Sequence, residues 1–231
     1  MGNIYQNQIY LKNNPEWHEG DSDWKAKQIL KMLNQNNLFP TKICEVGCGA
    51  GEVLNQLSNK VTHEAEYFGY EISPDAFKIC NKKTRYNLTF FLKDILQEND
   101  LNFNVLLCID VFEHVDDYYG FLRGLREKAE YKIFHIPLDL TVSTLVRLAP
   151  LKMARNKYGH VHHFTRETAL ATLEYSGYKI FDSFYTYGSL DLPNLGWKAN
   201  LLRIPRKLLF SLPGNLFQCV LGGCALMVLA K

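Results

Sequence analysis

The sequence lacks a long apolar run, and its first residues do not have the pattern of a secretion signal. Its longest apolar stretch, 216–230, is interrupted by Gln218 and two glycines and falls short of the roughly 20 residues that a spanning helix needs. We expect a turn there, followed by a final buried strand. The polar N-terminal residues have neither the basic flank nor the apolar run of a signal peptide, so we do not expect secretion.

Cysteine pairs and runs of like charge are also missing. The six cysteines form no C-x-x-C motif, and Cys44, Cys80 and Cys108 lie inside apparent core segments, which is typical of free thiols in a reducing compartment. The 26 basic and 24 acidic residues are spread along the chain, so there is no tail for a polyanion. We expect a cytoplasmic protein, and the composition leaves its oligomeric state open.

Strand-like and helix-like segments alternate along the 231 residues. The alternation predicts one α/β domain over 1–231, with a mostly parallel, Rossmann-like sheet, helices on both faces, and a ligand beyond the carboxyl ends of the strands. Ser73 and Thr165 are expected to cap helices, and Gly177 to end one. Strands are expected at 41–46, 66–72, 87–94, 104–111, 131–138, 178–187 and 224–231.

Three regions stand outside this alternation. Residues 1–40 are expected to form an N-terminal helix and lid, in which Trp17, His18 and Trp24 either cover the ligand or pack against the sheet edge. The segments 139–164 and 189–223 are expected to be insertions that build a cap on the substrate side.

A glycine-rich loop follows the first expected strand in "KICEVGCGAGEVL" (42–54). A dinucleotide fingerprint would need glycine or alanine at position 52, which is Glu52, and no Gly-Lys-Ser/Thr follows as in a phosphate-binding P-loop. Glu45 at the end of the strand would repel a phosphate. The pattern therefore favours a ligand with a positive charge near the loop, such as S-adenosylmethionine, whose ammonium Glu45 could bind directly or through water.

Three further acids end successive strands. Glu71 ends the second strand, where a carboxylate can accept hydrogen bonds from both ribose hydroxyls. Asp94 ends the third strand and is placed for the adenine amino group, with Ile95 beside the ring. Asp110 ends the fourth strand.

This ordered set resembles the class I S-adenosylmethionine-dependent methyltransferases, through "ICEVGCGAG", "YEIS", "LKDI" and "IDVFEHV". The resemblance implies a seven-stranded sheet with the order 3-2-1-4-5-7-6 and an antiparallel last strand. The cofactor contacts that we expect are Glu45, Gly47, Cys48, Gly49, Gly51, Glu71, Ile72, Asp94, Ile95, Ile109 and Asp110.

The motif after the fourth expected strand indicates which class of molecule accepts the methyl group. The N/D-P-P-Y/F motif of amino-group methyltransferases that act on nucleic acids is absent, and no basic, aromatic-rich module is present, so we expect no nucleic acid partner. "FEHV" resembles the branch that methylates small molecules, quinones, sugars and lipids, of the methyltransferase type 11/23 kind. That likeness implies that Glu113 lines the active site, whereas His114 is expected to be a cap or core histidine.

A methyl acceptor with a hydroxyl group needs a base with a pKa near neutrality, which histidine supplies. "YGHVHHFT" offers His160, His162 and His163, and a strand-like alternation would send His163 to the opposite side from the other two. We expect the base among His160, His163 and Glu113, and a hydroxyl oxygen as the acceptor atom. A zinc site lacks a fourth ligand at a recognisable spacing, so we expect no metal.

The segment 198–212 is basic and amphipathic, combining Lys198, Arg203, Arg206 and Lys207 with leucines and Phe210. It is expected to cover the pocket as a helix, or to rest on an anionic membrane surface or a lipid acceptor. Two other functions stay open: methylation of a lipid at the membrane, and a cofactor-binding module without chemistry. The intact series of acids favours an active methyltransferase with a small-molecule substrate.

Overall fold

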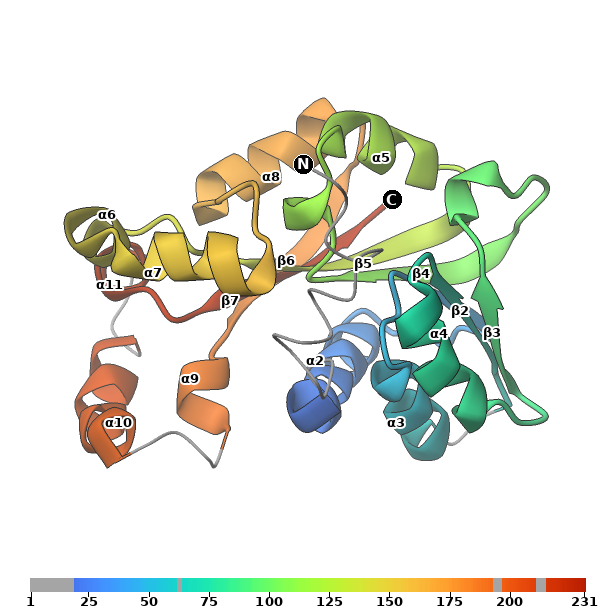
Figure 1. Cartoon of the computed structure of the whole chain (residues 1–231), viewed down its shortest axis with the longest axis horizontal. Helices are drawn as coiled ribbons and strands as arrows, with labels where there is room; N and C mark the ends of the chain where they lie inside the picture. The colour runs from blue at the N-terminus through green and yellow to red at the C-terminus, as the bar shows by residue number, and fades with distance from the viewer. Residues whose placement is uncertain (1–18, 62–63, 193–196, 211–214) are drawn as a thin grey trace.

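The computed structural model describes residues 19–61, 64–192, 197–210 and 215–231, except for the side chains of 189 and 197–203 (Figure 1). Trp17 and His18 of the expected lid lie outside these residues. A single seven-stranded sheet runs through the molecule in the order β3-β2-β1-β4-β5-β7-β6. Its strands are β1 (Lys42–Val46), β2 (Glu66–Glu71), β3 (Leu88–Leu92), β4 (Phe103–Ile109), β5 (Ala129–Pro137), β6 (Ile180–Thr186) and β7 (Ala225–Ala230).

The strands β1 to β5 pair in parallel, whereas β7 is antiparallel to both β5 and β6. This arrangement confirms the expected order and the antiparallel last strand. The central strands are buried on both faces, as the near-continuous apolar runs of a parallel sheet require.

Helices cover both faces of the sheet (Figure 1). On one face lie α2 (Ser22–Gln35), α3 (Glu52–Lys60) and α4 (Pro74–Cys80), and on the other lie α5 (Tyr118–Leu125) and α8 (Arg166–Tyr175). The hydroxyls of Ser73 and Thr165 accept the N-cap hydrogen bonds of α4 and α8, and Gly177 has a φ of 93° just beyond α8. The sequence therefore predicted the caps and the stop correctly.

Two apolar cores hold the layers together, one on each face. Ile29, Met32 and Leu57 lie in the core beneath α2 and α3. Leu122 and Leu173 lie in the core beneath α5 and α8.

The two expected insertions are helical and gather on the left side of the view in Figure 1, and the end of the first reaches the centre of the molecule. The first contains α6 (Val142–Arg147), α7 (Ala149–Met153) and the π-helical turn η5 (Ala154–Tyr158), and the second contains α9 (Gly188–Asp191), α10 (Trp197–Phe210) and α11 (Leu216–Leu221). The turn expected at the start of 216–230 is the helix α11, which packs against α6. Among the residues described, no helix is both long and apolar enough to cross a bilayer.

Candidate active site

A cavity of about 1300 Å³ opens at the carboxyl ends of β1, β2 and β4. The strand order reverses between β1 and β4, which is the place where ligands bind in open α/β sheets. All but one of the expected cofactor residues line this cavity, the exception being Gly51. They are Glu45, Gly47, Cys48, Gly49, Glu71, Ile72, Asp94, Ile95, Ile109 and Asp110.

The glycine loop depends on left-handed backbone that only glycine adopts without strain. The φ angles of Gly47, Gly49 and Gly51 are 62°, 53° and 73°. A Cβ on Gly51 would lie 2.5 Å from the ring of Phe90 and 2.7 Å from the Cβ of Cys80. Gly51 therefore serves the packing behind the loop, which explains its place outside the cavity.

Glu71 is buried, and its carboxylate is held by three backbone groups. Oε2 accepts a hydrogen bond from the N–H of Gly49, and Oε1 accepts from the N–H groups of Ile72 and Ser73, at 2.8, 2.8 and 2.7 Å. Burial raises the pKa of Glu71, and these three donors oppose the rise. The side chain thus has a fixed orientation at the cavity wall and still offers lone pairs to a ligand.

Glu45 is 3% exposed, and its Oε2 has no hydrogen-bond partner among the described residues. Burial raises the pKa of Glu45 well above its usual range, while the nearby Lys25 ammonium opposes that shift. An unpaired carboxylate oxygen at the wall of a cavity is a binding group for a cation or a hydrogen-bond donor.

Asp94 lies at the rim of the cavity, where it caps the short helix η3 (Ile95–Gln97). Its Oδ1 accepts a 2.9 Å hydrogen bond from the N–H of Leu96. Ile95 is buried beside it, and Ile72 is 47% exposed. This side of the cavity combines one carboxylate with apolar surface, as recognition of a purine ring requires.

The carboxylate of Asp110 contacts two side chains from distant parts of the chain, the imidazole of His135 and the ammonium of Lys25. Its carboxylate oxygens lie 2.6 Å from Nδ1 of His135 and 2.9 Å from Nζ of Lys25. Lys25 also pairs with Asp21 at 3.0 Å, and the other ring nitrogen of His135 lies 2.9 Å from the hydroxyl of Thr186.

The electrostatics of this network are those of an ion pair. Burial alone would raise the pKa of Asp110, but His135 and Lys25 outweigh it and hold that pKa far below the usual range. Burial likewise would lower the pKa of Lys25, and the carboxylates of Asp110 and Asp21 instead raise it. Lys25 and His135 were missed in the sequence, because nothing local marks a lysine of an amphipathic helix or a histidine inside a strand as partners of Asp110.

Glu113 and His114 belong to the short helix η4 (Phe112–His114), which follows β4. Glu113 is 1% exposed, and neither carboxylate oxygen has a hydrogen-bond partner among the described residues. Burial and the Asp110 carboxylate raise the pKa of Glu113 well above its usual range. His114, expected as a cap or core residue, lines the cavity, whereas Glu113 lies behind the wall.

The three histidines after η5 do not follow a strand-like alternation. Nδ1 of His160 lies 2.5 Å from Oδ2 of Asp139, and Nδ1 of His163 lies 3.6 Å from the same oxygen, so these two share one side. Nε2 of His162 instead lies 3.0 Å from the carbonyl oxygen of Val115. The expected division was wrong because 159–164 is irregular backbone. His160 lines the cavity and His163 does not.

The family follows from a match to a family model. A model described as "Methyltransferase domain" matches residues 17–182, a span that contains the glycine loop, Glu71, Asp94, Asp110 and the histidine segment. The chain belongs to this methyltransferase family.

Two curated relatives of this methyltransferase are ubiquinone biosynthesis O-methyltransferases. The protein from Glaesserella parasuis serovar 5 (strain SH0165) is 22% identical over 145 residues, which cover 54% of the chain and 60% of the relative. The protein from Rickettsia typhi (strain ATCC VR-144 / Wilmington) is 24% identical over 94 residues, which cover 40% and 38%. The chain thus spans about 60% or less of the length of the curated relatives that it matches.

Solved structures share the fold of this methyltransferase. The N-methyltransferase NodS from Bradyrhizobium japonicum WM9, in complex with S-adenosyl-L-homocysteine, superposes with a TM-score of 0.63 at 16% identity. The match covers 99% of the chain and 97% of NodS. At this identity the likeness shows the fold alone.

Proposed function

We propose that the chain transfers the methyl group of S-adenosylmethionine to a hydroxyl oxygen of a small molecule. The observation that carries this proposal is the cavity at the sheet's reversal point, whose wall holds Glu45, Glu71 and Asp94 at the ends of three neighbouring strands. The cofactor, when bound, supplies an electrophilic methyl group on a sulfonium. The protein must then position the acceptor and remove its proton.

The residues present fit the cofactor. The unpaired, buried oxygen of Glu45 suits an ammonium group, and the glycines at 47 and 49 leave room for the methionine part next to the backbone. Glu71, already oriented by backbone donors, would accept hydrogen bonds from the ribose hydroxyls.

The side of the cavity next to Asp94 would hold the adenine ring of the cofactor. Asp94 would accept a hydrogen bond from the adenine amino group, with Ile95 and Ile72 against the ring. Cys48, Ile109 and Asp110 also line the cavity.

Proton removal is assigned to the group formed by His160, His163 and Glu113. His160 lines the cavity, and its contact with Asp139 orients the imidazole as in other carboxylate–histidine pairs. Burial lowers the pKa of His163, which favours the neutral form of that imidazole. Oxygen is preferred over nitrogen as the acceptor because a hydroxyl needs such a base, and the names of the two curated relatives agree with it.

The test is an acceptor screen with methyl-labelled donor, in which phenols, catechols and sugar hydroxyls are compared with matched amines. We expect label in hydroxyl acceptors. Alanine variants at His160, His163 and Glu113 should lower the turnover rate and keep the affinity for S-adenosylhomocysteine. Label only in amines would contradict the oxygen assignment, and full activity of all three variants would contradict the assignment of the base.

A lipid acceptor at a membrane surface is the second candidate, and one surface favours it. Val146, Ile204, Leu208 and Leu216 on α6, α10 and α11 are 65–79% exposed. The insertions that carry them have one acidic residue each, Asp139 and Asp191 near their starts, and none over 140–164 and 192–223. Apolar side chains among basic ones suit an anionic lipid surface.

Vesicles distinguish the two acceptor classes. Cosedimentation with phosphatidylglycerol vesicles, lost in an Ile204→Asp, Leu208→Asp double variant, would favour the lipid acceptor. A chain that binds the cofactor but labels neither lipids nor small molecules would be a binding module without chemistry.

A further inference from the structure

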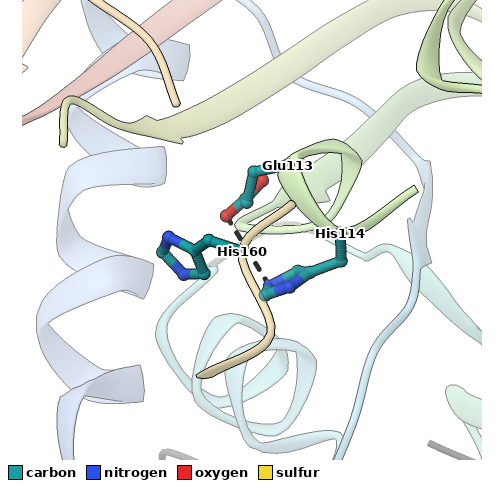
Figure 2. A group of neighbouring side chains, drawn as sticks. All are labelled: Glu113, His114 and His160. Carbon is teal, nitrogen blue, oxygen red and sulfur yellow. Dashed lines mark ion pairs between the residues drawn. The ribbon is translucent and has the colours of Figure 1, made fainter. Parts of the chain in front are cut away.

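Three side chains with metal-binding atoms converge beside the cavity, where η4 meets the segment after η5 (Figure 2). One ligand atom from each of Glu113, His114 and His160 lies within 4.8 Å of the other two. Oε1 of Glu113 is 3.8 Å from Nε2 of His114, and the rings of His114 and His160 meet edge to face with centroids 4.9 Å apart. The three residues form the Glu113 cluster.

Glu113 contributes two unpaired, buried oxygen atoms to this cluster. The side chain is 1% exposed and neither carboxyl oxygen has a hydrogen-bond partner among the described residues, a costly arrangement that a bound cation would relieve. The main-chain carbonyl oxygen of Glu113 accepts hydrogen bonds of 2.9 and 3.0 Å from the N–H groups of Val161 and His162. These bonds fix η4 against the histidine segment and keep Glu113 aimed at the two imidazoles.

We infer that Glu113, His114 and His160 bind a divalent transition-metal ion of the zinc class. Two imidazoles and one carboxylate are a donor set that suits Zn²⁺, Co²⁺ or Fe²⁺, whereas Mg²⁺ and Ca²⁺ prefer oxygen ligands. Metal–ligand distances of about 2.0–2.1 Å place the ligand atoms of a tetrahedral site about 3.3 Å apart. Because the ligand atoms lie within 4.8 Å of one another, side-chain movements of about 1.5 Å or less close the cluster to that size.

Asp139 has a supporting role in this site. Its Oδ2 accepts a hydrogen bond from Nδ1 of His160 at 2.5 Å, which fixes the orientation and tautomer of the ring, as carboxylates do for many metal-bound histidines. Asp139, His160 and His163 form a second group of compatible size. The Glu113 cluster is preferred because a contact of 2.5 Å is a hydrogen bond and leaves no room for an ion between the two atoms.

The role of the ion rests on the proposed function. His114 and His160 line the cavity, so a fourth coordination position would face the acceptor. A hydroxyl bound there would lose its proton to cavity water at a lower pKa, the oxygen–methyl bond would form, and the sulfur–methyl bond would break with release of neutral S-adenosylhomocysteine. His160 and Glu113 would then act as ligands, and their loss would lower the rate through the metal.

The test is a calorimetric titration of the tag-free full chain, treated with a chelator, with Zn²⁺ and separately with Co²⁺. We expect one ion per chain and little heat from Mg²⁺ at the same concentration. Glu113→Gln and His114→Gln should weaken binding at least tenfold, because each removes one of three protein ligands. His162→Gln is the matched control, since His162 lies in the same segment outside the cluster, and it should bind normally.

Folding of the variants is checked by thermal unfolding with and without Zn²⁺. The wild-type chain should unfold at a higher temperature with the ion, whereas Glu113→Gln should fold without it and show no shift. Failure of the wild type to bind either ion at about 100 µM, or unchanged affinity in Glu113→Gln, would overturn the site. Weakened binding in His163→Gln with normal binding in Glu113→Gln would also overturn it, in favour of the second group. Binding of S-adenosylhomocysteine is measured on the same samples. A chain that binds S-adenosylhomocysteine but no metal ion would overturn the metal site and leave the proposed function standing.

Discussion

The backbone N–H of Gly49 donates a hydrogen bond of 2.8 Å to Oε2 of Glu71. This bond joins the glycine loop after β1 to the end of β2, two elements that are adjacent in the sheet. With Oε1 held by Ile72 and Ser73, the carboxylate is oriented before any ligand arrives. The same side chain thus shapes the loop and presents lone pairs to the cavity.

Replacement of Glu71 by glutamine should weaken the binding of S-adenosylhomocysteine about 10- to 100-fold. The amide keeps the size of the side chain but loses the charge that strengthens hydrogen bonds to ribose hydroxyls, worth about 1.5–3 kcal/mol for a bond to a charged group. Calorimetric titration measures the change. Glu66→Gln, at the exposed opposite end of β2, is the control and should bind normally. Unchanged affinity in Glu71→Gln would rule out the ribose assignment.

Replacement of Lys25 by methionine should lower the free energy of unfolding by about 2–3 kcal/mol. The change leaves Asp110 and Asp21 without their shared cation in a largely buried place, and breaking a buried pair from one side is costly. Lys27→Met is the control, because its ion pair with Asp23 is exposed and should matter by less than about 1 kcal/mol. Urea unfolding at pH 7 measures both. Equal losses of unfolding free energy in the two variants would show that the buried ion pairs of Lys25 stabilise the fold no more than an exposed pair does.

Lys132 gives a test of pH dependence away from the cavity. It is 3% exposed, its ammonium donates to the carbonyl oxygens of Arg126 and Ala129, and burial, aided by the Arg126 charge, lowers its pKa from 10.5 to about 8. Between pH 8 and 10.5 the unfolded chain binds more protons at this lysine than the folded chain, so the free energy of unfolding rises with pH through this group.

The rise is measured against Lys132→Met, in which the contributions of cysteines and tyrosines are unchanged. From pH 7.5 to 9.5 the wild type should gain about 2 kcal/mol relative to the variant. Parallel stability curves for the two proteins would show that Lys132 keeps an ordinary pKa in the fold.

The sheet and the cofactor side of the cavity could be predicted because their signals are local. Each of the strands β1 to β4 is a largely apolar run followed by an acid or a glycine turn, and parallel strands bring those ends to one edge. Glu45, Glu71 and Asp94 therefore lie where the sequence placed them, at the wall of one cavity. Their contacts with the cofactor stay predictions.

The acceptor side could not be predicted in the same way, because it depends on contacts between distant segments. His160 comes close to Glu113 and His114 where the carbonyl of Glu113 accepts hydrogen bonds from residues 161 and 162. The histidine segment follows no regular period, so alternation gave the wrong side for one of its members. Asp110 and Lys25 likewise meet through tertiary packing of α2 against the strand ends.

Titration calorimetry with S-adenosylhomocysteine tests the central claim most directly. We expect one site per chain with a dissociation constant in the micromolar range by order of magnitude, and competition by S-adenosylmethionine for the same site. No heat with either compound, from a chain shown to be folded by its unfolding transition, would contradict the assignment of the cavity as a methyltransferase cofactor site.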